Sequence, residues 1–75
     1  MYRIGIDLGG TNTAAGLVDE NGHIIDRANV KTCLPTTLER IIENITALCV
    51  QLMARNHLQK ADILRIGVEI GRAHV

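Results

Sequence analysis

Aromatic side chains are almost missing from this 75-residue chain, which has no phenylalanine, no tryptophan and a single tyrosine, Tyr2. Hydrophobic residues still make up 47% of it, so any core must be built from aliphatic side chains.

Basic and acidic residues balance at eight each. Such a chain offers no electrostatic attraction to nucleic acid or an anionic membrane. No apolar run approaches the roughly 20 residues of a membrane-spanning helix. The sequence therefore predicts neither a nucleic-acid partner nor a membrane partner.

Cysteine is scarce as well. Cys33 and Cys49 stand sixteen residues apart, with no CxxC pair and no obvious set of histidine or cysteine partners. That pattern favours two buried free thiols over a disulfide, and free thiols are typical of a reducing compartment. We therefore expect a cytoplasmic protein. Seventy-five residues form at most one small domain. At this length a single core rarely supplies more than about 3–5 kcal/mol, so a disulfide, a metal or a partner is usually needed.

The first part of the chain predicts three strands. Residues 2–8 alternate between apolar and other side chains, so that Asp7 points away from the apolar face. Residues 13–19 are small and apolar without a helical stripe, and residues 23–31 mix β-branched and polar side chains as a half-exposed strand does. Residues 19–22 contain Asn-Gly, which suits a hairpin turn. Three strands joined by short turns make an antiparallel meander.

After Pro35 the apolar residues change from strand-like to helical spacing. Thr36 opens a Thr-x-x-Glu capping box that Glu39 closes, and an amphipathic helix is predicted over residues 37–56. Its apolar stripe comprises Leu38, Ile41, Ile42, Ile45, Leu48 and Leu52. Residues 62–68 resume a strand pattern, and a strand that follows a helix should pair parallel with an earlier one by a right-handed crossover. The predicted fold class is α/β, in the order βββαβ.

The stretch GIDLGGTNT, residues 5–13, carries the chemistry of the chain. Its two glycines let the backbone approach a ligand closely, and successive N–H groups in a turn form an anion-binding concavity. Two threonines add hydroxyls and an asparagine adds an amide. Asp7 cannot hold a phosphate directly, because like charges repel, but it can hold Mg²⁺ through water. The candidate nucleotide-binding residues are Asp7, Gly9, Gly10, Thr11, Asn12 and Thr13, with Asp7 also the candidate metal-binding residue.

Two commoner phosphate-binding motifs are excluded. Walker A requires Gly-Lys-Ser/Thr entering a helix, and the dinucleotide fingerprint also requires a helix after its glycines, whereas this sequence continues as a strand. A bare Gly-Gly pair would be interpreted as a simple hairpin turn. The whole string, with Asp7 on the face opposite the core, favours a phosphate site instead.

The string IGIDLGGTNTAAGLVDENGHII, residues 4–25, resembles the first phosphate motif of the superfamily of sugar kinases, heat-shock chaperones and actin. Within it, the ROK family of bacterial sugar kinases and repressors fits best, particularly its glucokinases, because Asp-Leu-Gly-Gly-Thr at residues 7–11 is characteristic. Asn12 stands where many members carry lysine. The resemblance covers residues 1–68 and implies a partial ribonuclease-H-like lobe of the actin-like ATPase kind.

The resemblance also implies ATP-dependent phosphorylation of a hexose such as glucose, with Asp7 assisting Mg²⁺ and residues 9–12 facing the ATP phosphates. ROK kinases additionally use the aspartate of an Asn-Asp pair as general base, a Glu-x-Gly-His sugar contact, a cysteine-rich zinc motif and a second nucleotide-binding lobe. None of these motifs occurs in this sequence. We therefore assign no catalytic base and no zinc site. Residues 1–69 are expected to be a truncated N-terminal nucleotide-binding lobe, inactive alone.

Residues 70–75, IGRAHV, depart from the Gly-x-Pro-Gly continuation typical of the family. They are what ATC GGA AGA GCA CAC GTC encodes, a run found in a widely used sequencing adapter. We expect a non-native tail here. The alternative is a true end in which Ile70 extends the last strand.

Two functions remain open, and a third, an ATPase lobe of the chaperone or actin branch, is disfavoured by Gly10. The first is the N-terminal part of a ROK sugar kinase, with ATP and a hexose as its partners. The second is a small non-enzymatic module that binds phosphate or self-associates through the face of the sheet that no helix covers. In either form the chain should be a homo-oligomer, because exposed aliphatic surface and an open strand edge favour association.

Overall fold

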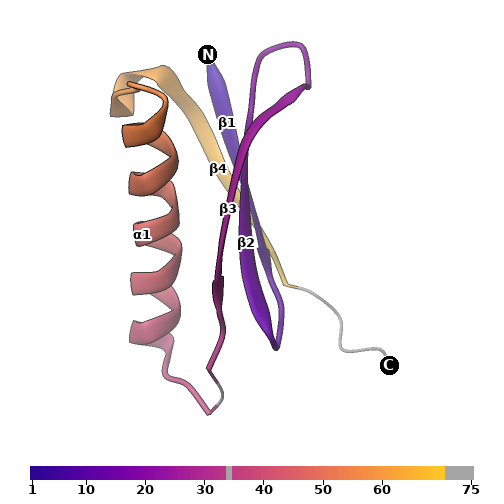
Figure 1. Ribbon diagram of the computed structural model, residues 1–75, viewed down its shortest axis with the longest axis vertical. Helices are drawn as coiled ribbons and strands as arrows, with labels where there is room; N and C mark the ends of the chain where they lie inside the picture. Colours follow the sequence, from indigo (N-terminus) through magenta and orange to yellow (C-terminus); the bar gives the residue numbers. More distant parts are fainter. Residues whose placement is uncertain (34, 71–75) are drawn as a thin grey trace.

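The computed structural model describes residues 1–33 and 35–70. The elements in chain order are β1 (Tyr2–Leu8), β2 (Asn12–Val18), β3 (Ile24–Lys31), α1 (Leu38–Arg55), the short 3-10 helix η1 (Lys60–Asp62) and β4 (Ile63–Ile70). Figure 1 shows α1 lying along one face of a twisted four-stranded sheet. The predicted order βββαβ is confirmed, although η1 was not foreseen. Of the expected tail, Ile70 ends β4, and residues 71–75 lie outside the described residues.

The strands lie in the order β3-β2-β1-β4. The pairs β1–β2 and β2–β3 are antiparallel, as the predicted meander requires, and β4 is parallel to β1 as predicted. Strands β1, β3 and β4 consequently run in the same direction, and their C-terminal ends meet at the edge of the sheet that holds the β1–β2 turn. This edge carries the candidate site.

Alternation along β1 separates a core face from an exposed face. Ile4 and Ile6 are 1% and 2% exposed, whereas Gly5 and Asp7 between and beyond them are exposed. The core consists of Ile4, Ile6, Ala15, Leu17, Ala28, Leu48, Cys49 and Leu52. Fully burying a leucine or isoleucine side chain stabilises a protein by roughly 1.5–3 kcal/mol, so burial of this small aliphatic cluster favours folding.

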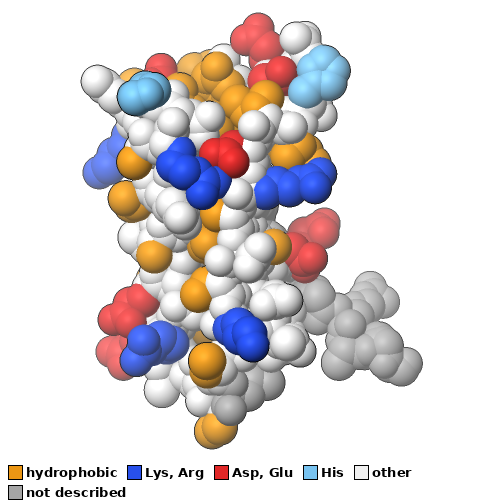
Figure 2. Space-filling model, in the orientation of Figure 1, with side chains coloured by type: hydrophobic (Ala, Val, Ile, Leu, Met, Phe, Trp, Pro, Cys, Tyr) orange, Lys and Arg blue, Asp and Glu red, His pale blue; other side chains and the backbone are white. Residues whose placement is uncertain are grey.

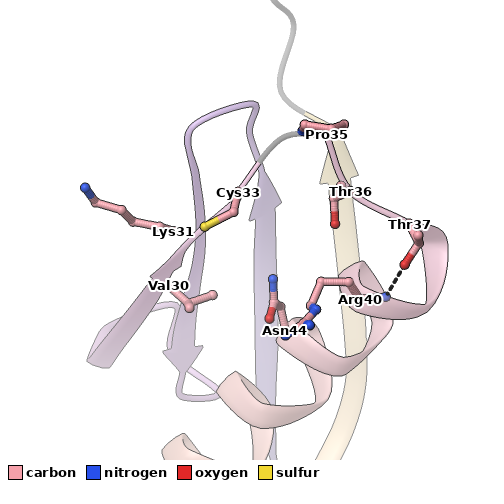
Figure 3. Close-up of a pocket in the computed structure, with 8 residues that line it drawn as sticks. All are labelled: Val30, Lys31, Cys33, Pro35, Thr36, Thr37, Arg40 and Asn44. Atoms are coloured by element: carbon pink, nitrogen blue, oxygen red, sulfur yellow. Dashed lines mark hydrogen bonds between the residues drawn. The ribbon is translucent and has the colours of Figure 1, made fainter.

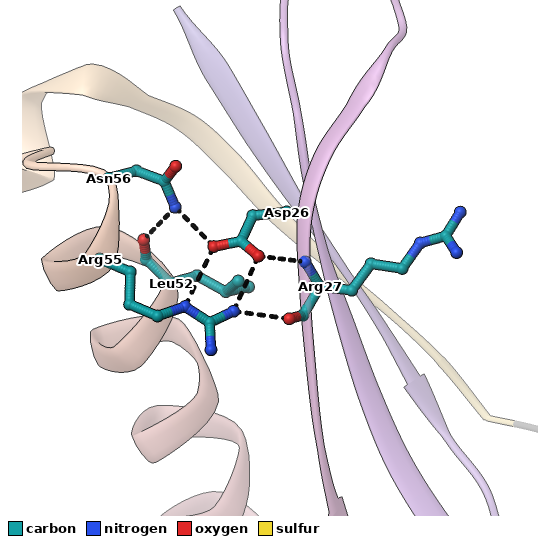
Figure 4. Close-up of polar contacts among 5 residues, drawn as sticks. All are labelled: Asp26, Arg27, Leu52, Arg55 and Asn56. Carbon is teal, nitrogen blue, oxygen red and sulfur yellow. Dashed lines mark hydrogen bonds and ion pairs between the residues drawn. The ribbon is translucent and has the colours of Figure 1, made fainter.

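Helix α1 packs against β2 and β3, and a polar contact fixes its C-terminal end. Arg55 donates from Nε and Nη2 to the two carboxylate oxygens of Asp26, at 3.1 and 2.8 Å. The Asn56 amide donates to the same carboxylate at 2.8 Å (Figure 4). The hydrogen bond from Asn56 lowers the pKa of Asp26 most, and those from Arg55 lower it further. The end of the helix is therefore held over β3 by a charge-assisted contact.

The helix starts one residue later than the predicted capping box implies. The N-cap is Thr37, whose hydroxyl accepts the Arg40 N–H at 3.1 Å. The predicted box of Thr36 and Glu39 is therefore wrong. Two adjacent threonines offer the same capping chemistry, and only the backbone conformation decides which of them caps.

Two predictions about burial also need correction. Both cysteines are free, but only Cys49 is buried, while Cys33 is exposed because it follows β3 in the connection to α1, outside the core. Burial raises the pKa of the Cys49 thiol. In the predicted apolar stripe, Leu48 and Leu52 are buried, whereas Leu38 and Ile42 are 72% and 54% exposed. Ile41 between them is partly buried, so only Leu38 and Ile42 are left largely uncovered by residues 1–33 and 35–70.

Strand β4 has little cover. Leu64, Ile66 and Val68 are each about half exposed, and a groove of about 470 Å³ separates this strand from α1. The groove is lined mostly by aliphatic side chains, including Ile45, Val50, Met53, Ile63 and Ile66. On the face drawn in Figure 2, hydrophobic side chains emerge between charges of both signs. Within the described part of the chain, no helix combines the length and the apolar character that a membrane crossing needs.

Candidate functional site

The β1–β2 turn is tight because of a short backbone contact across it. The Gly9 N–H donates to the Asn12 carbonyl at 2.9 Å. A Cβ added at Gly9 would lie 2.9 Å from the same carbonyl oxygen, closer than real Cβ atoms approach backbone. The turn therefore needs glycine at this position for reasons of space.

The tip of the turn leaves two backbone donors open. Among the described residues, no acceptor meets the N–H of Gly10 or of Thr11. Both residues are exposed, so the two consecutive N–H groups are available to an external acceptor. Neighbouring N–H groups in a turn are a recurring way to bind an anion. The tip can therefore accept a phosphate without any change in the bonds that hold the hairpin together.

Asp7 lies on the exposed face of β1, two residues before the turn. It stands opposite Ala14 of β2 and beside Glu69 of β4 in the strand register. Paired residues of neighbouring strands point to the same face, so the two carboxylates share one end of the open face. Carboxylate oxygens are ligands that Mg²⁺ accepts, usually with several waters retained. Sequence reasoning found Asp7 but not Glu69, because the parallel register was needed to place the two together.

The structure separates Thr13 from the other five candidates. Asp7, Gly10, Thr11 and Asn12 are exposed and Gly9 is partly exposed, but Thr13 is 1% exposed and faces the core. Its hydroxyl is hydrogen-bonded to that of Thr32 at 2.7 Å. The Thr13 side chain thus ties β2 to the end of β3, while the other candidates gather at the hairpin tip and on the open face.

Three further carboxylates have local structural partners. Asp19 accepts the backbone N–H groups of Asn21 and His23, each at 2.9 Å. Asp62 accepts the Gln59 N–H at 2.8 Å, and Asp26 is bound to the end of α1 as described above. These three carboxylates therefore hold local structure together: a turn, the start of η1 and the end of α1. Among residues 1–33 and 35–70, no three metal-ligating side chains gather in one place.

A second hollow lies beside the site, between the end of β3 and the start of α1. It has a volume of about 580 Å³ and is lined by Val30, Lys31, Cys33, Pro35, Thr36, Thr37, Arg40 and Asn44. Figure 3 shows Arg40 and Asn44 on the helix side of this hollow, whereas the Lys31 side chain extends away from α1. Sequence reasoning gave Lys31 no role. Only the register of β2 and β3 places it directly opposite Asn12.

Comparison with known proteins gives consistent matches. The family model of the ROK family matches residues 3–72. A glucokinase of Streptomyces coelicolor is 50% identical over 44 residues, which are 59% of this chain and 13% of the relative. An N-acetylmannosamine kinase of Escherichia fergusonii is 37% identical over 68 residues, 91% of this chain and 23% of the relative. The chain thus spans less than a quarter of the length of these curated relatives.

Solved structures match the fold over almost the whole chain. The ROK family glucokinase from Streptomyces griseus, in complex with glucose and AMPPNP, superposes with a TM-score of 0.75 at 33% identity, over 93% of this chain and 20% of that one. The activator of 2-hydroxyisocaproyl-CoA dehydratase from Clostridium difficile, with bound ADPNP, gives a TM-score of 0.71. At 20% identity over 93% of this chain and 24% of that one, the second match concerns the fold alone. The βββαβ unit is therefore the start of an actin-like ATPase lobe.

Proposed function

The chain belongs to the ROK family, and on that premise we propose that it is the first phosphate-binding part of a longer ATP-dependent hexose kinase. One observation carries the proposal: the unbonded N–H groups of Gly10 and Thr11 lie at the tip of a hairpin whose adjoining strand presents Asp7. A glucokinase of the same family, related over 93% of this chain, is known in complex with glucose and a nucleotide analogue. Glucose and N-acetylmannosamine are the two sugars that the relatives suggest.

Each residue of the hairpin has a distinct task in this proposal. The Gly10 and Thr11 N–H groups donate to phosphate oxygens of ATP, and the Asn12 amide lies beside them. Gly9 keeps the turn narrow, and Thr13 secures it from the buried side through Thr32. Asp7 accepts hydrogen bonds from water that Mg²⁺ retains. When bound, Mg²⁺ neutralises phosphate charge, which together with positioning is most of what phosphoryl transfer requires.

We place the general base and the sugar contacts in the part of the protein that this chain does not include. Without them the chain alone should bind nucleotide weakly and turn over no sugar. We also place the reaction in the cytoplasm, where ATP is available and where the two free thiols stay reduced.

The decisive experiment begins with the genomic sequence beyond codon 69. We expect an open reading frame that continues into a Gly-x-Pro-Gly segment, an Asn-Asp pair and a cysteine-rich zinc motif. The longer protein should then transfer phosphate from ATP to glucose or N-acetylmannosamine in a coupled ADP-release assay. A reading frame that ends at codon 75, or a longer protein that phosphorylates neither sugar while binding ATP, would contradict the proposal.

A self-associating module is the second candidate, and the uncovered strand β4 favours it. Leu64, Ile66 and Val68 expose aliphatic surface next to the apolar groove against α1. Exposed apolar patches of this kind drive association. We expect the isolated chain to elute from a sizing column as a homo-oligomer, and Ile66→Lys to shift it toward the monomer. A wild-type chain that stays monomeric at high concentration would remove this candidate.

A further inference from the structure

Lys31 ends β3 at the same edge of the sheet as the β1–β2 turn. It pairs with Asn12 in the antiparallel register, and directly opposed residues of such strands have Cβ atoms about 4.5–5.5 Å apart. Gly9, which follows the end of β1, bonds to Asn12 across the turn. The Lys31 position therefore adjoins the first residue of β2 at the hairpin tip.

The lysine also points to the correct face. Asn12 and Ala14 lie two residues apart on β2 and therefore share a face, and Ala14 pairs with Asp7. Lys31, Asn12 and Asp7 are all exposed on this face. Figure 3 shows the Lys31 side chain extending away from Arg40 and Asn44 of α1. Its ammonium group is thus on the side of the sheet that presents Asp7.

Two hydrogen bonds fix the backbone next to Lys31 to the hairpin. The Thr32 N–H donates to the Thr11 carbonyl at 2.8 Å, and the Thr32 and Thr13 hydroxyls are 2.7 Å apart in the core. Lys31 itself has no hydrogen bond or ion pair with any described residue. The base of the side chain is held in place, while its charged end stays available. Rigid support of this kind lowers the cost of binding a ligand.

We propose that Lys31 is a further phosphate contact of the nucleotide site, donating from its ammonium group to a phosphate oxygen of ATP beside Asn12. This inference rests on the proposed nucleotide site and adds a positive charge, which residues 5–13 around the turn do not contain. Asp7 and Glu69 make this end of the open face acidic, and a phosphate with several negative charges needs a nearby cation in addition to Mg²⁺. Lysine serves this purpose as a point charge.

The test uses the longer protein and four variants: Lys31→Ala, Lys31→Arg, the double variant Lys31→Ala with Asn12→Lys, and Lys60→Ala as a matched control on η1. A hydrogen bond to a charged group, when lost, weakens binding by about tenfold or more. We therefore expect Lys31→Ala to raise the KM for ATP by about tenfold, with an unchanged KM for the sugar and an unchanged melting temperature. Lys31→Arg should retain most of the affinity. Asn12→Lys should restore it in the double variant, because the two positions face each other.

Binding of ATP, ADP and adenosine by calorimetry separates a phosphate contact from a general structural effect. Lys31→Ala should weaken ATP and ADP binding but leave adenosine binding unchanged. An unchanged KM for ATP, or an equal loss for adenosine, would overturn the role of Lys31. If the wild type binds ATP but phosphorylates neither sugar, the kinase proposal fails and the calorimetry still decides on Lys31. If the wild type binds no ATP, both proposals are wrong.

Discussion

Two turns of the same sheet are built in opposite ways. In the β2–β3 turn, the Asp19 carboxylate accepts two backbone N–H groups, and the Gly22 N–H donates to the Asp19 carbonyl at 3.1 Å. In the β1–β2 turn, the Gly9 N–H is bonded but those of Gly10 and Thr11 meet no acceptor in the described part of the chain. The first turn bonds the N–H groups of Asn21, Gly22 and His23 to Asp19, whereas the second leaves two consecutive N–H groups without an acceptor among the described residues.

The comparison shows that a glycine in a turn can be required for two different reasons, which the sequence alone does not distinguish. Gly22 has a φ of +87°, a conformation that glycine adopts without strain, and nothing lies near its missing side chain. Gly9 is required for a different reason, since a Cβ there would collide with the Asn12 carbonyl. Gly22 therefore provides the backbone conformation of the β2–β3 turn, and Gly9 leaves room for the Asn12 carbonyl in the β1–β2 turn.

The largest effect is expected from Gly9→Ala in the longer protein. The added Cβ must displace the Asn12 carbonyl, which shifts the tip donors, and a misplacement of about 1 Å can cost on the order of 100-fold in rate. Steady-state kinetics should show this loss in kcat/KM for ATP. Gly22→Ala is the matched control and should leave the KM for ATP unchanged. Equal kinetics for Gly9→Ala and the wild type would show that the hairpin does not position the phosphates.

Asp7→Asn should have the next largest effect. The amide keeps the size of the side chain but removes the charge that orients water around Mg²⁺, and losing a hydrogen bond to a charged group costs about 10- to 100-fold. We expect a lower kcat and a higher Mg²⁺ requirement in a metal titration. Asp19→Asn makes the same change in the β2–β3 turn and should affect neither quantity. If both variants respond alike to Mg²⁺, Asp7 has no special relation to the metal.

Gly22→Ala should affect stability instead of activity. An alanine in the left-handed region costs about 1–2 kcal/mol, and no contact around Gly22 offsets that cost. Denaturant unfolding of the protein should detect the loss. Gly67→Ala is the control, because its added Cβ also meets nothing within 4 Å and its φ is not in the left-handed region. A loss of the same size in both variants would mean that the conformation of Gly22 is not the cause.

Much of the fold could be predicted because the period of the apolar residues differs between segments. Alternation in residues 2–8 predicted the first strand, and the three-to-four spacing around Leu48 and Leu52 predicted the helix. The Asn-Gly turn and the crossover rule supplied the meander and the parallel last strand. The cap at Thr37 was missed because Thr36 next to it has the same chemistry. Cys33 was wrongly placed in the core, since composition says nothing of where a connecting segment runs.

For the candidate site, alternation along the first strand predicted the face of Asp7, whereas the faces of Thr13 and Lys31 were not predicted. The string around Gly9 identified the turn, yet the register decides that Thr13 faces the core and that Lys31 faces the hairpin. A shift of one residue would exchange the two sides. Periodicity fixes which residues of one strand share a face, whereas pairing between strands depends on contacts distant in sequence.

The smallest expected effect concerns the acid sensitivity of the β2–β3 turn. Hydrogen bonds from the backbone N–H groups of His23 and Asn21 lower the pKa of Asp19 from its ordinary value of 3.8. A carboxylate with a depressed pKa stabilises the fold above its unfolded-state value, and this contribution is lost as the pH falls through the lower folded-state pKa. The stability difference between the wild type and Asp19→Asn should therefore be constant near neutral pH and shrink below about pH 4. Denaturant midpoints measured at successive pH values give this difference directly. If this stability difference stays constant into the acid range, the Asp19 contacts do not favour the charged carboxylate. The Asp19 carboxylate would then not be what distinguishes the β2–β3 turn from the β1–β2 turn.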